Sequence, residues 1–137
     1  MRIGVPKEIK THEYRVGLTP ESVAELIADG HEVWVETKAV AGIGSDDAEY
    51  VTAGAVIQPD AATIFAGCEM IVKVKEPQAV ERAMLREGQI LYTYLHLAPD
   101  PDQTRELLDS GCVGIAYETV TAPQGGLPLL KPMSQVA

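Results

Sequence analysis

The sequence lacks several features that mark common classes of protein. Only 5% of its 137 residues are aromatic, and 20 acidic side chains outnumber 11 basic ones, which gives a net charge of −9. Because this charge would repel a phosphate backbone, we expect no nucleic-acid partner. No apolar run approaches the ~18 residues of a membrane span, and "MRIGVPKEIK" (1–10) has no long apolar stretch typical of a secretory signal. The sequence predicts a soluble, cytoplasmic protein without a membrane partner.

Residues that form redox, metal and dinucleotide sites are also scarce. The two cysteines, Cys68 and Cys112, are far apart and lie in apolar surroundings, so we interpret them as small buried side chains. His12 and His31 have no ligand-like spacing, and we predict no metal site. The segment "GIGSDD" (42–47) contains GxG without the third glycine of a dinucleotide-binding fingerprint, so we interpret it as a turn.

Apolar residues make up 46% of the chain and fall into short runs that alternate with helical patterns. Strands are predicted at 2–6, 31–36, 55–57, 69–77, 89–97 and 112–120, and helices at 19–30, 45–54, 59–67, 78–88 and 100–111. This alternation is typical of the α/β class. It predicts one domain over residues 1–137, a doubly wound, mostly parallel sheet of flavodoxin- or Rossmann-like type with helices on both faces. Ser134, in "KPMSQVA" (131–137), resembles the cap of a helix whose continuation is missing, so we expect a fragment or a truncated domain.

Three polar residues follow predicted strands. Arg15 lies in the loop after strand 2–6, Lys75 near the end of strand 69–77, and His96 near the end of strand 89–97. Because the carboxyl ends of parallel strands meet at one edge of the sheet, where ligands bind, these side chains are predicted to share a site. Arg grips a carboxylate, Lys adds a compact positive charge and His moves protons near neutral pH. The set favours a small 2-oxo or 2-amino acid as substrate.

Each residue also has a simpler interpretation when it is taken alone. Arg15 could be a solvated loop charge, His96 a hydrogen-bonded core histidine and Glu118 a surface acid. Lys73 is predicted to extend to the surface, and it would share a face with Lys75 because strand side chains alternate. The shared edge is what favours a functional role.

Four segments carry a resemblance to a known family. They are "MRIGVPKEIKTHEYRVGLTPESV" (1–23), "VKVKEP" (72–77), "YTYLHLA" (92–98) and "LPLLKPMSQVA" (127–137). In order and spacing they closely resemble the amino-terminal part of bacterial L-alanine dehydrogenases. That family includes proton-translocating transhydrogenases, and enzymes of the lysine and saccharopine pathway are more distant relatives.

The resemblance implies roles for particular residues. Arg15 and Lys75 would bind the carboxylate and carbonyl oxygens of pyruvate or alanine, and His96 would be the acid/base residue. Glu118, Met133 and Ser134 match positions near the substrate and cofactor cleft. The implied reaction is the reversible NAD-dependent oxidative deamination of L-alanine to pyruvate and ammonium, catalysed by a homohexamer.

The family's chains are more than twice as long and contain a separate Rossmann domain that binds NAD. The resemblance therefore implies that residues 1–137 are the substrate-binding half, that NAD binds mainly to the absent domain, and that this chain alone is inactive. Two alternatives stay open. One is the domain of a transhydrogenase or of a lysine- or saccharopine-type dehydrogenase. The other is a flavodoxin-like scaffold without catalytic activity.

Overall fold

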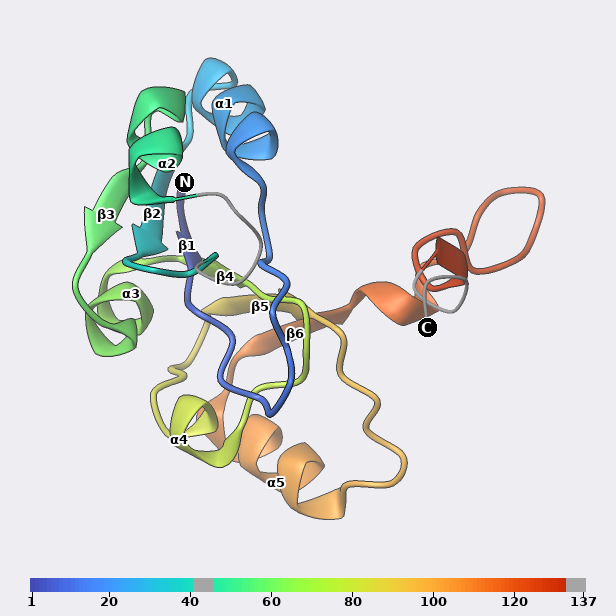
Figure 1. Cartoon of the computed structure of the whole chain (residues 1–137). Coiled ribbons are helices and arrows are strands. Elements are labelled where there is room, and N and C mark those ends of the chain that lie inside the picture. The colour runs from blue at the N-terminus through green and yellow to red at the C-terminus, as the bar shows by residue number, and fades with distance from the viewer. Residues whose placement is uncertain (41–45, 133–137) are drawn as a thin grey trace.

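A single six-stranded parallel sheet organises the molecule (Figure 1). The structure is a computed structural model that describes residues 1–40 and 46–132. The strands are β1 (Arg2–Val5), β2 (Glu32–Glu36), β3 (Val56–Gln58), β4 (Met70–Val72), β5 (Ile90–Thr93) and β6 (Val113–Ala116). Their order is β3-β2-β1-β4-β5-β6, and every adjacent pair is parallel. The prediction of a doubly wound α/β sheet is confirmed.

The helices are α1 (Pro20–Ala28), α2 (Asp47–Ala53), α3 (Ala61–Gly67), α4 (Ala79–Arg82) and α5 (Pro101–Ser110), and a 3-10 turn, η1 (Tyr117–Thr119), follows β6. Local sequence rules set several of their ends. The Thr19 side chain accepts a hydrogen bond from Ser22 N, and Pro20 occupies the first position of α1, where its missing N–H costs nothing. Gly54 ends α2 with a φ of +106°, a conformation that favours glycine.

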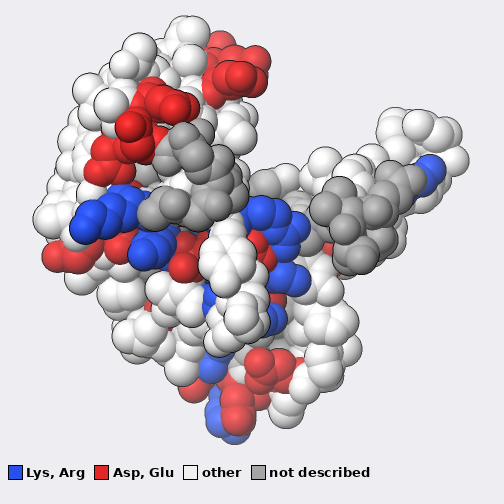
Figure 2. All heavy atoms as spheres, in the orientation of Figure 1, with Lys and Arg blue, Asp and Glu red and all other residues white. Residues whose placement is uncertain are grey.

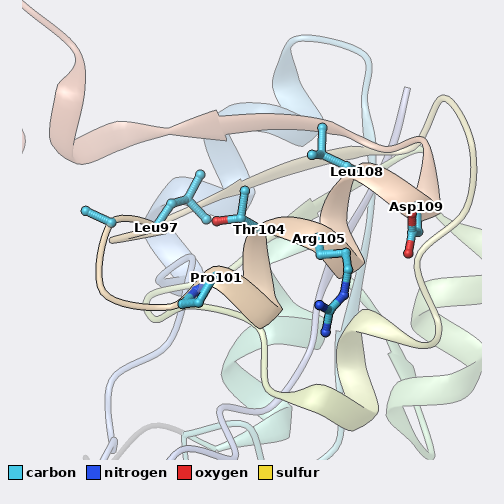
Figure 3. Close-up of a pocket in the computed structure, with 7 residues that line it drawn as sticks. Leu97, Pro101, Thr104, Arg105, Leu108 and Asp109 are labelled. Atoms are coloured by element: carbon cyan, nitrogen blue, oxygen red, sulfur yellow. The ribbon is translucent and has the colours of Figure 1, made fainter.

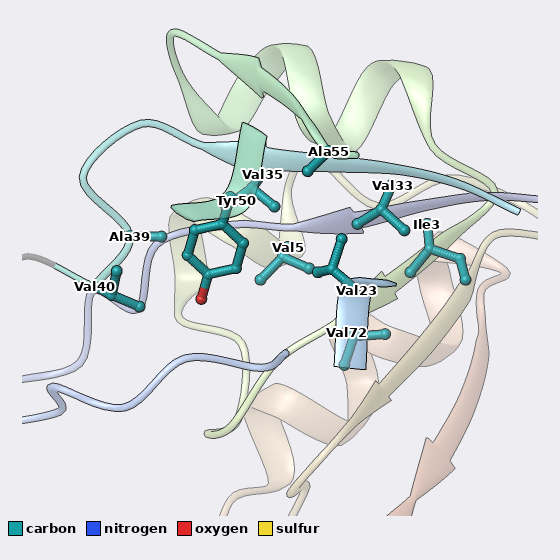
Figure 4. Close-up of a cluster of buried hydrophobic side chains, with 10 residues drawn as sticks. All are labelled: Ile3, Val5, Val23, Val33, Val35, Ala39, Val40, Tyr50, Ala55 and Val72. Carbon is teal, nitrogen blue, oxygen red and sulfur yellow. The ribbon is translucent and has the colours of Figure 1, made fainter. Parts of the chain in front are cut away.

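The helices form layers on the two faces of the sheet. The first apolar cluster contains Val23 of α1 and Tyr50 of α2, which pack against side chains of β1 and β2 (Figure 4). The second cluster, on the opposite face, joins residues of α3 and α5 to β4 and β5. Gly4 of β1 is required by this packing, because a Cβ there would lie 2.6 Å from the Ile64 side chain of α3.

Three predicted strands and one predicted helix are at least five residues shorter than the sequence pattern suggested. Segments 69–77, 89–97 and 112–120 are extended only as far as Val72, Thr93 and Ala116, and helix 78–88 is regular only over Ala79–Arg82. The chain leaves β4 to contact the loop after β1, and beyond β5 His96 adopts a φ of +46° that no strand allows. After β6 the chain turns into η1 and runs away from the sheet (Figure 1). Of the turn predicted at 42–47, residues 42–45 lie outside the described residues, whereas Asp46 caps α2 and Asp47 begins it. The helix predicted to begin at Ser134 also lies outside the described residues.

Both cysteines have free thiols. Cys68 is fully buried, as predicted, and burial raises the pKa of its thiol to about 11. Cys112 is only half-buried, because it lies just before the edge strand β6. Within residues 1–40 and 46–132, no helix is long and apolar enough to cross a membrane.

Candidate active site at the carboxyl edge of the sheet

The strand order reverses between β1 and β4, and this point defines the candidate site. The numbering runs β3-β2-β1 on one side and β4-β5-β6 on the other. In open α/β sheets, the crevice beyond the carboxyl ends of strands at such a reversal is the usual place for a ligand. The loops after β1, β4 and β5 supply Arg15, Lys75 and His96 at this edge. Figure 2 shows Lys and Arg side chains gathered across the middle of one face, with acidic side chains around them.

Lys75 lies three residues beyond the end of β4 and is half-buried. Its Nζ atom lies 4.8 Å from the centroid of the Tyr94 ring, a cation–π distance. Its backbone N–H donates to Glu8 Oε1 at 3.2 Å. The ammonium group is therefore held beside an aromatic surface, where it carries positive charge into the site.

Lys73 does not extend to the surface, so that prediction was wrong. It is 2% exposed, and its Nζ atom lies 3.0 Å from both Glu8 Oε1 and Glu81 Oε2. The strand alternation on which the prediction relied stops at Val72, so the chain turns and places Lys73 between two carboxylates. A buried ammonium requires such partners. Burial raises the pKa of the Glu81 carboxyl, and the attraction of Lys73 opposes this shift.

Arg15 is exposed and lies in the loop between β1 and α1. Its Nε and Nη2 atoms donate to Glu13 Oε2 and Oε1 at 2.8 and 2.6 Å. This bidentate pair raises the pKa of Arg15, and the hydrogen bond from Arg15 lowers the pKa of Glu13 against the effect of burial. The charge of Lys75 lowers the pKa of Glu13 further. Arg15 and Lys75 thus both favour the ionised form of the Glu13 carboxylate.

The β1–α1 loop, which carries Arg15, packs closely against the end of β4, the strand that leads to Lys75. A Cβ atom added to Gly17 would lie 2.5 Å from the carbonyl oxygen of Val72, far inside van der Waals contact. The absence of a side chain at this position therefore allows the loop that carries Arg15 to lie directly on the end of β4.

His96 is exposed, so the interpretation of a core histidine was wrong. Its ring stacks on Tyr94, with centroids 5.5 Å apart and an interplanar angle of 13°. Tyr94 contacts both His96 and Lys75, so it joins two of the three predicted site residues. The His96 imidazole is accessible and stacks on the ring that also contacts the Lys75 ammonium group. In this position it is able to exchange protons with a bound ligand and with water.

Glu118 is buried at 8% exposure, and the alternative of a surface acid was wrong. It lies in η1, and its Oε1 atom accepts from Leu95 N at 3.1 Å and from His96 N at 3.0 Å. The side chain therefore supports the backbone beneath His96. Met133 and Ser134, the other residues predicted to lie near a cleft, are outside the described residues.

Sequence reasoning missed two residues that the structure places at the site. Glu8 and Glu13 lie in the charged loop after β1 and were not distinguished from solvated side chains, yet Glu8 is 6% exposed and the Glu13 side chain is also 6% exposed. A signal was available for Glu8, because a carboxylate just after one strand is well placed to pair with a lysine just after a neighbouring strand.

A separate cavity of about 460 Å³ lies beside α5 (Figure 3). It is lined by Leu97, Ala98, Pro101, Thr104, Arg105, Leu108 and Asp109. Arg15, Lys75 and His96 do not line it, so it is distinct from the site described above. Among the described residues, no group of three or more His, Cys, Asp or Glu side chains is arranged to hold a metal ion.

Comparison with known proteins decides the family. Residues 4–137 match the family described as alanine dehydrogenase/PNT, N-terminal domain. The chain belongs to this family. Over its full length it is 57% identical to an alanine dehydrogenase of Halomonas elongata and 53% identical to one of Methanococcus maripaludis, and it spans 37% of the length of each.

Solved structures agree with this assignment. An L-alanine dehydrogenase structure superposes with a TM-score of 0.96 at 50% identity, and the match covers all of this chain and 38% of that one. A transhydrogenase from Sinorhizobium meliloti superposes with a TM-score of 0.80 at 29% identity, with 86% of this chain and 35% of that one covered. Within the family, the chain is thus more similar to these alanine dehydrogenases than to this transhydrogenase.

Proposed function

We propose that this chain is the substrate-binding part of an L-alanine dehydrogenase. The reaction would convert L-alanine, NAD⁺ and water reversibly into pyruvate, ammonium, NADH and a proton. The observation that carries the proposal is the placement of Arg15, Lys75 and His96 in the loops that follow β1, β4 and β5 at the strand-order reversal, with Lys75 and His96 both in contact with the Tyr94 ring. The identity of 50% or more to proteins named alanine dehydrogenase supports it.

The chemistry of the three side chains fits a small 2-oxo acid. The guanidinium of Arg15 would bind the substrate carboxylate through paired hydrogen bonds. The ammonium of Lys75 would polarise the carbonyl oxygen and stabilise the negative charge that develops there, an electrostatic effect. The exposed ring of His96 would return a proton to this oxygen in one direction and remove it in the other.

The described residues do not fit a dinucleotide cradle. The connection from β1 to α1 is long and charged, and its one glycine, Gly17, is packed against the Val72 carbonyl. A cofactor pyrophosphate needs a short glycine-rich turn that leads into a helix. We therefore place the binding of NAD, which would supply hydride transfer, mainly outside residues 1–40 and 46–132. Residues 1–137 would be the amino-terminal substrate-binding domain of a longer protein, inactive alone.

The resemblance to alanine dehydrogenases also supports a cytoplasmic homohexamer as the working assembly. The first experiment is an NADH-oxidation assay with pyruvate and ammonium. It would use the polypeptide encoded by the complete gene and, in parallel, residues 1–137 alone. Activity confined to the complete polypeptide is expected. If neither oxidises NADH, the proposal is wrong, and substrate profiling with NADP and with lysine precursors would address the transhydrogenase and lysine-type alternatives.

A substitution tests the site within the same assay. Lys75→Ala in the complete polypeptide is expected to lower kcat/KM about 10²- to 10³-fold, as does loss of other groups that stabilise developing charge. Lys7→Ala is a matched control, because Lys7 is also a lysine at the carboxyl edge but is exposed. Near-normal turnover of Lys75→Ala would refute the role given to this residue.

A further inference from the structure

The three proposed site residues share one structural feature. The backbone N–H of each donates a hydrogen bond to the carboxylate of a glutamate. The pairs are Arg15 with Glu13 at 3.0 Å, Lys75 with Glu8 at 3.2 Å and His96 with Glu118 at 3.0 Å. We call these acidic residues, Glu8, Glu13 and Glu118, the glutamate layer. Their side chains are shielded from solvent, so each depends on the protein for its hydrogen-bond donors.

Glu8 fixes the direction in which the chain leaves β4. Besides Lys75 N, its carboxylate accepts from Val74 N at 3.1 Å and from Lys73 Nζ at 3.0 Å. Three donors from consecutive residues thus converge on one group that belongs to the loop after β1. Hydrogen bonds to an ionised carboxylate are stronger than neutral ones, so this segment has little freedom to rotate.

Glu13 orients the guanidinium of Arg15 without using all of its donors. It accepts from the backbone N, from Nε and from Nη2 of Arg15. The Nη1 group and the outer hydrogen of Nη2 are not required by this pair, and they form the edge that a substrate carboxylate would meet. Glu13 therefore holds the arginine from one side and leaves the Nη1 edge out of the pair.

Glu118 supports a backbone conformation that is unfavourable for His96. The φ of His96 is +46°, a region that non-glycine residues rarely occupy. The carboxylate of Glu118 accepts from the N–H groups of Leu95 and His96, and the Gln103 side chain donates to the carbonyl of Leu95 at 3.0 Å. These bonds hold the turn that places the imidazole on the Tyr94 ring.

We propose that Glu8, Glu13 and Glu118 are positioning residues, and that each positions the one substrate-binding or proton-transfer residue whose backbone it holds. The inference rests on the proposed function, because it concerns the same three site residues. None of the glutamates is given a contact with substrate; each acts through its partner. Loss of one should therefore change the kinetic parameter that its partner governs rather than all parameters equally.

The test uses glutamine variants of the complete polypeptide. Gln keeps the shape of Glu but replaces one acceptor oxygen by an NH₂ donor. This donor cannot accept a hydrogen bond from the N–H groups that the glutamate binds. Glu13→Gln is expected to raise KM for pyruvate about tenfold with kcat nearly unchanged, and calorimetry should show pyruvate binding weakened by a similar factor. Glu118→Gln is expected to lower kcat about tenfold, to shift the pH dependence of kcat and to move the NMR resonances of the His96 ring.

Glu36→Gln is the matched control. The Glu36 carboxylate also accepts a backbone N–H at this edge of the sheet, from Lys7 at 2.9 Å, but Lys7 is not a site residue. Glu36→Gln should leave KM and kcat within about twofold of the wild type, because the Glu36 carboxylate holds no site residue. Glu8→Gln would also remove an acceptor from buried Lys73 and could prevent folding for that reason. The test therefore relies on the Glu13 and Glu118 variants.

Two results would overturn the inference. One is a folded Glu13→Gln and Glu118→Gln pair with KM and kcat within twofold of the wild type. The other is a uniform loss of activity in these variants and in Glu36→Gln that follows their melting temperatures, which would indicate a purely structural role. If the wild type itself lacks activity, the proposed function is wrong, and the positioning role is then tested by NMR alone. Unchanged resonances of the His96 ring in Glu118→Gln would refute that role.

Discussion

Substitution of Gly17 by alanine tests how closely the two sides of the site must approach each other. The added Cβ would lie 2.5 Å from the Val72 carbonyl oxygen and 2.9 Å from its carbon, whereas ordinary contacts begin at 3.4 Å. Both obstructing atoms are backbone atoms of β4, which cannot rotate away. The loop must therefore move outward by about 1 Å, and Arg15, two residues earlier, moves with it.

A displacement of about 1 Å at a substrate-binding group is expected to lower kcat/KM about 10²-fold. The assay is NADH oxidation with pyruvate and ammonium, together with urea unfolding to show that the variant is folded. Gly114→Ala is a suitable control, because a Cβ there meets only the Leu95 side chain at 3.5 Å. Wild-type kcat/KM in a folded Gly17→Ala variant would refute the argument that close contact of the loop with β4 sets the position of Arg15.

Three further outcomes concern stability and reactivity. Lys73→Met would leave two buried carboxylates without their cation and should lower the free energy of unfolding by about 3–5 kcal/mol; a loss below about 1 kcal/mol in urea titrations would contradict the buried ion pair. Burial raises the pKa of Tyr50 to about 12 from an ordinary 10, so stability present below pH 10 is lost as the pH rises to 12. Between pH 10 and 12 the urea unfolding midpoint should decline less for Tyr50→Phe than for the wild type. An equal decline in the two proteins would contradict the effect of Tyr50 burial. A thiol reagent should modify Cys112 before Cys68, because Cys68 is fully buried; simultaneous modification would show that the core opens.

Local pattern was sufficient to predict the elements of the fold. The strand and helix order followed from apolar runs, and caps such as Thr19 and Gly54 followed from rules that involve only neighbouring residues. Strand ends were harder. Apolar alternation continues past Val72 and Thr93, and the N–H groups of Lys73 and Tyr94 still donate to the neighbouring strand. The extended segments end there because the following N–H groups, of Val74 and Leu95, donate instead to the distant carboxylates of Glu8 and Glu118. Contacts of this kind depend on the topology and leave no trace in a local window.

In the candidate site, too, some residues were predictable from the sequence and others depended on contacts between distant segments. Arg15, Lys75 and His96 were predicted because parallel strands bring their carboxyl ends to one edge, a rule that depends only on strand order. The burial of Lys73 was not predictable in this way, because its partner Glu8 is 65 residues distant in sequence. Acidic residues in a charged loop are usually solvated, so nothing local separated Glu8 and Glu13 from the other acids of the chain.

The boundary between β1 and β4 has a consequence for the order of folding. Every other pair of adjacent strands joins consecutive strands of the chain, whereas β1 pairs with β4, through Ile3 with Met70 and Gly4 with Ile71. Each three-stranded half can form through local crossovers, and the entropy of closing the long loop falls on this one pairing. We therefore expect the two halves to dock late. Because Arg15 follows β1 and Lys75 follows β4, on the two sides of this boundary, the site would be assembled only in the last step of folding, and a partly folded chain would have no affinity for substrate.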